Sequence, residues 1–225
     1  LFRSLFSDEV DFEREWLPDA RRYYANIVGK YGVQVQALLK KAAALDIQMI
    51  CPLHGPVWRK DLEWFIDKYD KWSRYEPEDK AVVIVYGSIY GNTENAADAL
   101  AARLTEKGVK DIKMYDVSRT HVSELISEIF RCSHVVLACS TYNGGIYPPM
   151  ADLLEDMKAL SVQNRTVALM ENGTWAAASG RLITAKLEEM KNISLLDTKI
   201  SIKSTLQNGR ETELDAFAQQ IVEAM

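Results

Sequence analysis

Two runs in this chain are apolar at every position, Val82–Tyr86 and Val135–Cys139. A strand with one face in water alternates apolar and polar residues, whereas a strand covered on both faces is apolar throughout. Neither run is long enough to cross a bilayer. We therefore expect both runs to be central strands of a sheet that lies inside a globular protein, and we expect no membrane partner.

Beyond residue 80, five strand-like runs alternate with helical patterns. The predicted strands are Ala81–Tyr86, Asp111–Val117, His134–Cys139, Thr166–Met170 and Thr198–Ser204, and the predicted helices are Glu94–Lys107, Thr120–Arg131, Met150–Ala159, Ser179–Met190 and Glu211–Ala224. This alternation predicts an α/β fold, a doubly wound five-stranded parallel sheet in the order 2-1-3-4-5. Such sheets bind ligands at the carboxyl ends of strands one and three.

The first 80 residues follow another pattern. We expect helices at Asp19–Lys30, Val33–Leu45 and Asp61–Trp72, and one short strand at Ile47–Cys51. The polar, proline-containing stretch Ser73–Lys80 is typical of a linker. One strand cannot close a sheet, so this segment is either the end of a larger α/β domain or a small helical appendage packed on the sheet domain. The sequence leaves both interpretations open.

Charge and cysteine usage exclude several classes of function. The net charge is −5 with acids and bases mixed along the chain, so nucleic acid and anionic membranes are poor partners. Cys51, Cys132 and Cys139 have no paired or zinc-binding spacing, and we expect small buried hydrophobes in a reducing, cytoplasmic compartment. The chain has no signal-peptide pattern and no initial Met, which indicates a fragment or a processed chain.

The loop after the first predicted strand is rich in hydroxyls and has no cation. It consists of Ser88, Ile89, Tyr90, Gly91, Asn92 and Thr93. The first N–H groups of a helix lack intrahelical partners and bind phosphate without a lysine. The patterns GxxxxGK[ST] and GxGxxG are absent, which argues against a nucleotide hydrolase and a dinucleotide site. The loop therefore predicts a terminal phosphate held by backbone dipoles and hydroxyls, the alternative being an ordinary turn with Thr93 as helix cap.

Two further loops follow the third and fourth predicted strands. They carry the candidate ring-binding residues Thr141, Tyr142, Asn143, Gly144 and Gly145 and, in the later loop, Asn172, Gly173 and Trp175. Aromatic side chains stack on a flat ring, and glycines let the backbone approach it. Trp175 lies among small residues, so a role as core anchor is the less favoured alternative.

These motifs resemble a known family. The segment Ser88–Thr93 is similar to the phosphate loop of flavodoxins, [ST]-x-[TY]-G-x-T, and the pattern over Ala81–Met225 resembles a flavodoxin-like FMN domain. Asp8–Val10, Ala20–Ile27 and Cys51–Trp58 resemble the end of the metallo-β-lactamase-like αβ/βα domain of flavodiiron proteins, which precedes their flavodoxin-like domain. The resemblance implies residues 1–75 as the carboxyl-terminal portion of that domain, residues 76–225 as the FMN domain, and His54 as an iron ligand.

The chain departs from the family at its main iron motif, H-x-E-x-D-H, which is absent. The histidines are His54, His121 and His134, and one imidazole cannot hold two irons. We therefore expect no catalytic residues here, an FMN cofactor in this chain, and a diiron centre only in the intact protein. In the isolated fragment, His54 is expected to be a turn histidine without metal.

The resemblance also implies an activity and partners. It implies an oxidoreductase in which FMN passes electrons to a non-haem diiron centre that reduces O₂ to water or NO to N₂O. The implied partners are a second copy in a head-to-tail dimer or tetramer and a small electron donor such as rubredoxin. Two alternatives remain: a stand-alone flavodoxin-like FMN quinone reductase, and a non-enzymatic electron-carrier module.

Overall fold

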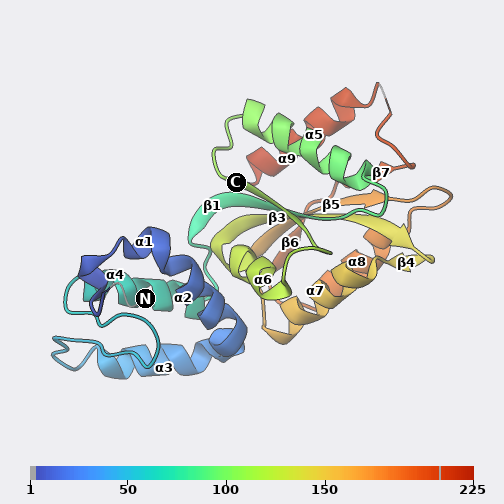
Figure 1. Ribbon diagram of the computed structural model, residues 1–225. Coiled ribbons are helices and arrows are strands. Elements are labelled where there is room, and N and C mark those ends of the chain that lie inside the picture. The colour runs from blue at the N-terminus through green and yellow to red at the C-terminus, as the bar shows by residue number, and fades with distance from the viewer. Residues whose placement is uncertain (1–3, 208) are drawn as a thin grey trace.

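A twisted sheet with helices on both faces forms the centre of the molecule, as a computed structural model of residues 4–207 and 209–225 shows (Figure 1). The parallel strands are β1 (Asp79–Gly87), β2 (Ile112–Asp116), β3 (Cys132–Tyr142), β5 (Arg165–Asn172), β6 (Ile193–Leu195) and β7 (Ile200–Ile202). Their order is β2-β1-β3-β5-β6, with β7 paired to the end of β5. The predicted fold class and the order 2-1-3-4-5 are confirmed.

The helices divide between the two faces of the sheet. Helices α5 (Asn92–Glu106) and α9 (Glu211–Glu223) cover one face, and α6 (Val122–Arg131), α7 (Pro148–Ala159) and α8 (Ser179–Leu187) cover the other. Each face has its own apolar core, built on Ile84 and Val136 toward α5 and on Val85 and Val135 toward α6. Because both faces are covered, β1 and β3 are apolar at consecutive positions.

The last predicted strand is wrong in its extent. Instead of one strand at Thr198–Ser204, the edge consists of β6, which pairs with Arg165–Val167, and β7, which pairs with Met170–Asn172. Between these pairings β5 advances from residue 167 to 170, while the edge chain advances from 195 to 200. The two extra residues force the edge chain out of the ladder. Ser204 lies outside the strand with a φ of 66°.

The segment before the sheet is helical. It contains α1 (Phe12–Glu15), α2 (Leu17–Tyr23), α3 (Gly32–Ala42) and α4 (Leu62–Ser73), with a short 3₁₀ turn at Ser7–Glu9. The predicted helix at Asp19–Lys30 continues from α2 through a π-helical turn, Tyr24–Val28, and a 3₁₀ turn, Gly29–Tyr31. The predicted strand at Ile47–Cys51 is wrong, because only Ile50 pairs, in an isolated bridge to Trp58. None of the described helices is long and apolar enough to span a membrane.

This helical segment shares a core with one face of the sheet. Its aromatic side chains pack closely: the rings of Trp58 and Phe65 are stacked with centroids 4.2 Å apart, and those of Tyr24 and Trp72 are tilted with centroids 5.2 Å apart. These residues belong to the same buried cluster as Phe130 of α6. The segment is therefore packed on the sheet domain, although it also exposes many large apolar side chains, such as Leu53 and Val33.

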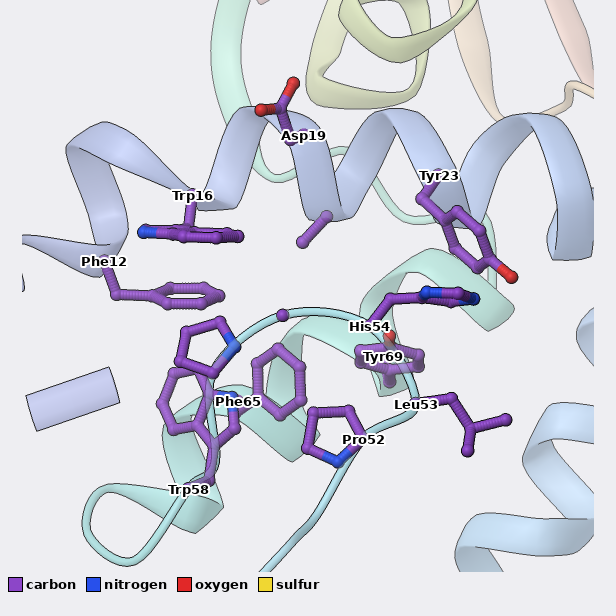
Figure 2. A pocket seen from close by; sticks show the side chains of 13 residues that line it. Phe12, Trp16, Asp19, Tyr23, Pro52, Leu53, His54, Trp58, Phe65 and Tyr69 are labelled. Carbon is purple, nitrogen blue, oxygen red and sulfur yellow. The ribbon is translucent and has the colours of Figure 1, made fainter. Parts of the chain in front are cut away.

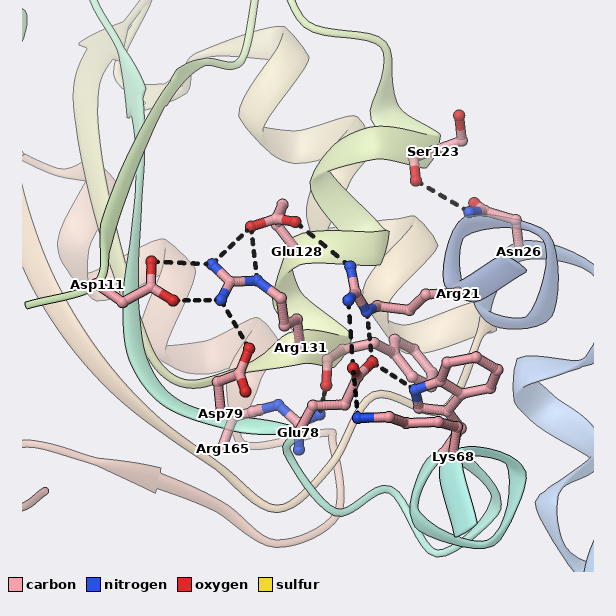
Figure 3. A network of polar contacts seen from close by, with 12 residues as sticks. Arg21, Asn26, Lys68, Glu78, Asp79, Asp111, Ser123, Glu128, Arg131 and Arg165 are labelled. Atoms are coloured by element: carbon pink, nitrogen blue, oxygen red, sulfur yellow. Dashed lines mark hydrogen bonds and ion pairs between the residues drawn. The ribbon is translucent and has the colours of Figure 1, made fainter. Parts of the chain in front are cut away.

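The predicted linker is held from both sides (Figure 3). The carboxylate of Glu78 is buried, forms an ion pair with Arg21 of α2 and accepts a hydrogen bond from the indole of Trp72. The buried guanidinium of Arg165 donates to the carbonyl oxygens of Tyr75 at 2.7 Å and of Phe130 at 2.6 Å. Because these contacts fix the backbone, residues 74–78 form a rigid junction between the two halves.

Candidate functional site

Three loops meet at the carboxyl ends of β1, β3 and β5, and one hydroxyl connects them. The side-chain oxygen of Thr93 accepts a hydrogen bond from the Asn172 amide at 3.2 Å and shares a hydrogen bond with the Ser140 hydroxyl at 2.8 Å. Thr93 is the second residue of α5, Ser140 lies in β3 and Asn172 ends β5. The structure thus brings together the three loops that the sequence singles out.

The first loop turns sharply before α5. Gly91 has a φ of 85°, and a Cβ there would meet nothing within 4 Å, so the backbone is open to a ligand on that side. Ile89 and Tyr90 are exposed. Asn92 is the first residue of α5, with Gly91 at the cap position, so Thr93 is not the helix cap. Instead, Thr93 is buried, and its hydroxyl bonds within the protein.

The Ser88 hydroxyl is the group in this loop that lacks a partner. Its Oγ is buried and makes no hydrogen bond to the described residues. An unsatisfied buried hydroxyl is costly, so such a group in a native protein calls for a ligand or an ordered water. Ser88 lies four residues before α5, whose first N–H groups also lack intrahelical partners. These neutral donors together are suited to binding an anion.

The second loop is a tight hairpin. Thr141 pairs with Ile146 and Tyr142 with Gly145, which makes β4 (Gly145–Ile146) antiparallel to β3. Asn143 and Gly144, with φ of 49° and 71°, form the two-residue turn. Positive φ at both central residues is the requirement of a type I′ turn, which explains the Asn-Gly pair.

Tyr142 exposes nearly half of its surface beside this turn. The Thr141 hydroxyl is engaged within the protein, where it accepts hydrogen bonds from the backbone N–H groups of Ala178 at 3.0 Å and Ser179 at 3.3 Å. The second loop therefore positions the third loop directly.

The third loop exposes its tryptophan. Trp175 is 93% exposed, so it is not a core anchor. Gly173 is required by packing, because a Cβ there would lie 2.7 Å from the carbonyl oxygen of Ala176. Asn172, in contrast, is buried and donates to Thr93 and, at 2.8 Å, to the carbonyl oxygen of Ser204. A bare aromatic ring on a loop with a fixed base is suited to covering a flat ligand.

The electrostatics of this edge are neutral to acidic. The Tyr86 hydroxyl donates to Glu94 at 3.0 Å. Burial, followed by the hydrogen bond and charge of Glu94, raises the pKa of Tyr86 to about 12, so this phenol stays protonated. Burial also raises the pKa of the Cys139 thiol, in the second half of β3, to about 11. Neither group is a nucleophile at neutral pH.

Four residues of this site were not among the predicted binding residues. Ser140 and Ser204 accept or share hydrogen bonds with the loops, and Ser179 donates to the carbonyl oxygen of Cys139 at 2.9 Å. Glu171 is buried and bonds to the start of α8. Its signal in the sequence is a single acid near the end of an apolar strand, eight residues before the Ser179-Gly180 pair.

His54 lies elsewhere, on the wall of an apolar cavity of about 430 Å³ in the helical segment (Figure 2). Its imidazole lies beside the Tyr23 ring, with the centroids 5.6 Å apart, while the Asp19 carboxyl points away from it. Within residues 4–207 and 209–225, no group of three His, Cys, Asp or Glu side chains could hold a metal ion. A diiron centre therefore does not fit the described part of this chain.

Among the described residues, the other two histidines also have no partners for a metal site. His121 caps α6, where its Nδ1 accepts a hydrogen bond from the Ser123 N–H at 3.2 Å. His134 is buried at the start of β3, and burial lowers its pKa.

The chain is similar to several known proteins, and these similarities agree with one another. Residues 84–213 match the flavodoxin family. The chain is 31% identical over 204 residues to the anaerobic nitric oxide reductase flavorubredoxin of Aeromonas hydrophila, covering 89% of this chain and 40% of that protein. The chain thus spans well under half the length of that curated relative.

Solved structures extend the likeness to the whole chain. Rubredoxin:oxygen oxidoreductase from Desulfovibrio gigas superposes with a TM-score of 0.88 at 27% identity, covering 99% of this chain and 55% of that one. An archaeal flavodoxin covers only 64% of this chain, with a TM-score of 0.55 at 21% identity. The helical segment as well as the sheet domain therefore has a counterpart in the longer protein.

Proposed function

The chain belongs to the flavodoxin family and resembles flavodiiron proteins over its whole length, and from this premise we propose that it is the FMN-binding, electron-transferring part of a flavodiiron oxidoreductase. The observation that carries the FMN assignment is the buried, unpartnered Ser88 hydroxyl next to the open backbone of Gly91 and the start of α5. A phosphate monoester satisfies such neutral donors, and no cation is needed because no phosphoryl group is transferred.

The residues present fit FMN. The Ser88 hydroxyl and the first N–H groups of α5 would hold the phosphate, and Tyr142, Trp175 and the backbone of residues 143–145 would contact the flavin ring. When bound, FMN supplies the one- and two-electron redox chemistry. Thr93 and Asn172 act by fixing the loops around it. Because the loop is neutral and Glu94 is near, the protein disfavours added negative charge and keeps the flavin potential low.

The proposal also covers the electron acceptor, the electron donor and the oligomeric state. In the intact protein, FMN would deliver electrons to a diiron centre that reduces O₂ or NO, and the donor would be rubredoxin or a similar carrier. Figure 1 shows β4, at the candidate FMN edge, and helices α1 and α4, which contribute to the wall of the His54 cavity, on opposite sides of the molecule. This arrangement supports delivery to a partner subunit in a head-to-tail dimer. We further propose a domain boundary near residue 75, with residues 1–75 ending a metallo-β-lactamase-like domain. The exposed Leu53 and Val33 support further protein packing there.

A titration with FMN tests this proposal. We expect one FMN per chain, with flavin fluorescence quenched on binding, and substoichiometric iron after incubation with Fe(II). Ser88→Ala should weaken FMN by about 1–2 kcal/mol, because it removes one hydrogen bond to a charged group. Ser194→Ala, an exposed serine on β6, is the matched control. A wild-type chain that does not bind FMN would refute the assignment, and two irons per chain would refute the separation of FMN from the metal site.

A further inference from the structure

Glu171 is a buried acid at the end of an apolar strand. It is 3% exposed and stands next to last in β5. Its Oε2 accepts a hydrogen bond from the Gly180 N–H at 2.8 Å, and its Oε1 accepts from the Ser201 hydroxyl at 2.7 Å and pairs with Lys199 at 2.8 Å. A buried carboxylate is stable only with such partners. Burial raises the pKa of Glu171, but these three donors outweigh it and lower the pKa, which keeps the group ionised.

Both ends of the third loop depend on this one carboxylate. β5 ends at Asn172, one residue after Glu171, and the loop that follows returns at α8, whose second residue is Gly180. The carboxylate therefore bonds across the base of the loop to the positive end of a helix, a favourable position for an anion. Gly180 makes the contact possible, because a Cβ there would lie 2.6 Å from Oε2.

The same loop has a fixed base and an exposed tip. At the base, the Thr141 hydroxyl accepts from the Ala178 N–H, and Asn172 donates to Thr93. At the tip, Trp175 projects into solvent. A loop held in its binding conformation loses less entropy when a ligand arrives, and this preorganisation raises affinity.

We propose that Glu171 is the positioning residue of this site. Its carboxylate closes the loop between β5 and α8 and so sets the position from which Trp175 covers the flavin. This inference rests on the proposed FMN function and deepens it. Glu171 acts through Trp175, so the effects of changing the two residues on FMN affinity must be coupled.

A double-mutant cycle tests the coupling. FMN dissociation constants are measured for the wild type, Glu171→Gln, Trp175→Ala and the double variant. Glutamine keeps the size of the side chain but removes the negative charge, and it places an amide N–H donor where the carboxylate accepted hydrogen bonds. We expect Glu171→Gln to weaken FMN about tenfold in the wild-type background, through the loss of charge-assisted hydrogen bonds, and less than about threefold in the Trp175→Ala background. Equal effects in both backgrounds would overturn the proposal.

Gly180→Ala disrupts the same contact by changing the donor residue. The added methyl group displaces the Glu171 carboxylate, while that carboxylate keeps its charge. This variant should show the same coupling to Trp175, and it carries the test alone if Glu171→Gln does not fold. Glu155→Gln, which breaks an exposed ion pair with Lys186, is the matched control and should leave FMN affinity unchanged. A wild type that does not bind FMN overturns the proposed function and this inference together. A wild type that binds FMN with no coupling overturns only the role of Glu171.

Discussion

The Asn172 amide donates a hydrogen bond to the Thr93 hydroxyl at 3.2 Å, between residues 79 positions apart in the sequence. This contact joins the end of β5 to the start of α5. Because Thr93 also shares a hydrogen bond with Ser140, its hydroxyl is a structural connection between three loops in addition to a candidate phosphate contact. A substitution at Thr93 should therefore alter the position of the third loop as well as that of the first.

Thr93→Ala should weaken FMN by about 1–2 kcal/mol, because it removes a hydroxyl from a site for a charged group and leaves the buried Asn172 amide with one partner fewer. Fluorescence titration measures the dissociation constant. Thr93→Ser keeps the hydroxyl and is the matched variant, expected to bind within about threefold of the wild type. An Ala variant that binds as tightly as the Ser variant would contradict the role of this hydroxyl.

Trp175→Ala should separate binding from stability. The side chain is 93% exposed, so its removal should change the free energy of unfolding by less than about 0.5 kcal/mol. FMN binding should weaken, because the ring loses an aromatic contact worth about 0.5–1.5 kcal/mol. Urea unfolding of the FMN-free chain and FMN titration measure the two effects. Large destabilisation without a change in FMN affinity would show that Trp175 packs in the core in solution.

Glu78→Gln should destabilise the fold strongly. It removes one partner of a buried ion pair and leaves the Arg21 guanidinium, whose side chain is 5% exposed, without its main counter-charge. Breaking such a pair costs about 3–5 kcal/mol. Arg74→Gln is the control, since its pairs with Asp70 and Glu76 are exposed and should be worth less than about 1 kcal/mol. Equal midpoints of urea unfolding for the two variants would argue against a rigid junction.

Asp111 should contribute to the acid sensitivity of the fold. The hydrogen bond from Arg131 lowers the pKa of Asp111 below its ordinary value of 3.8. A carboxyl group with a lowered folded-state pKa adds stability above its unfolded pKa and loses it as pH falls through the folded pKa. Stability measured by urea from pH 5 to pH 2.5 should therefore fall less steeply for Asp111→Asn than for the wild type. Parallel curves would show that the Arg131 contact contributes nothing in solution.

The cysteines should differ in reactivity. Cys132 and Cys139 are buried as expected, whereas Cys51 is exposed, so the expectation of a buried residue is wrong there. Burial raises the pKa of the Cys132 thiol to about 12 and that of the Cys139 thiol to about 11. Because the thiolate is the reactive form, iodoacetamide at pH 8 should label one cysteine in the folded chain and three in urea. Mass spectrometry of the labelled peptides identifies them. Labelling of Cys139 in the folded chain would indicate that the edge beside β3 opens.

Most of the fold was predictable because its signals are local. The apolar runs at Val82–Tyr86 and Val135–Cys139 became β1 and β3, and the loops that follow them meet as parallel topology requires. The errors lie in segments whose structure depends on pairing with another strand. Ile47–Cys51 has the composition of a strand but no neighbouring strand to pair with, and the edge strand divides because two extra residues do not fit the ladder. The roles of individual site residues stay predictions until a ligand is bound.

The sequence by itself determined the order of strands and helices, the neutral hydroxyl-rich turn at Ser88–Thr93 and the lack of a diiron motif, since each depends on residue types at fixed spacing. Only the tertiary structure decided that Thr93 bonds to Ser140 and Asn172, and that the Ser88 hydroxyl has no partner in the described part of the chain. It also decided that Glu171 closes the third loop and that Glu78 and Arg165 hold the linker. The physical reason is that hydrogen bonding and burial depend on which distant residues the fold brings together, and a pattern along the chain does not contain those distances.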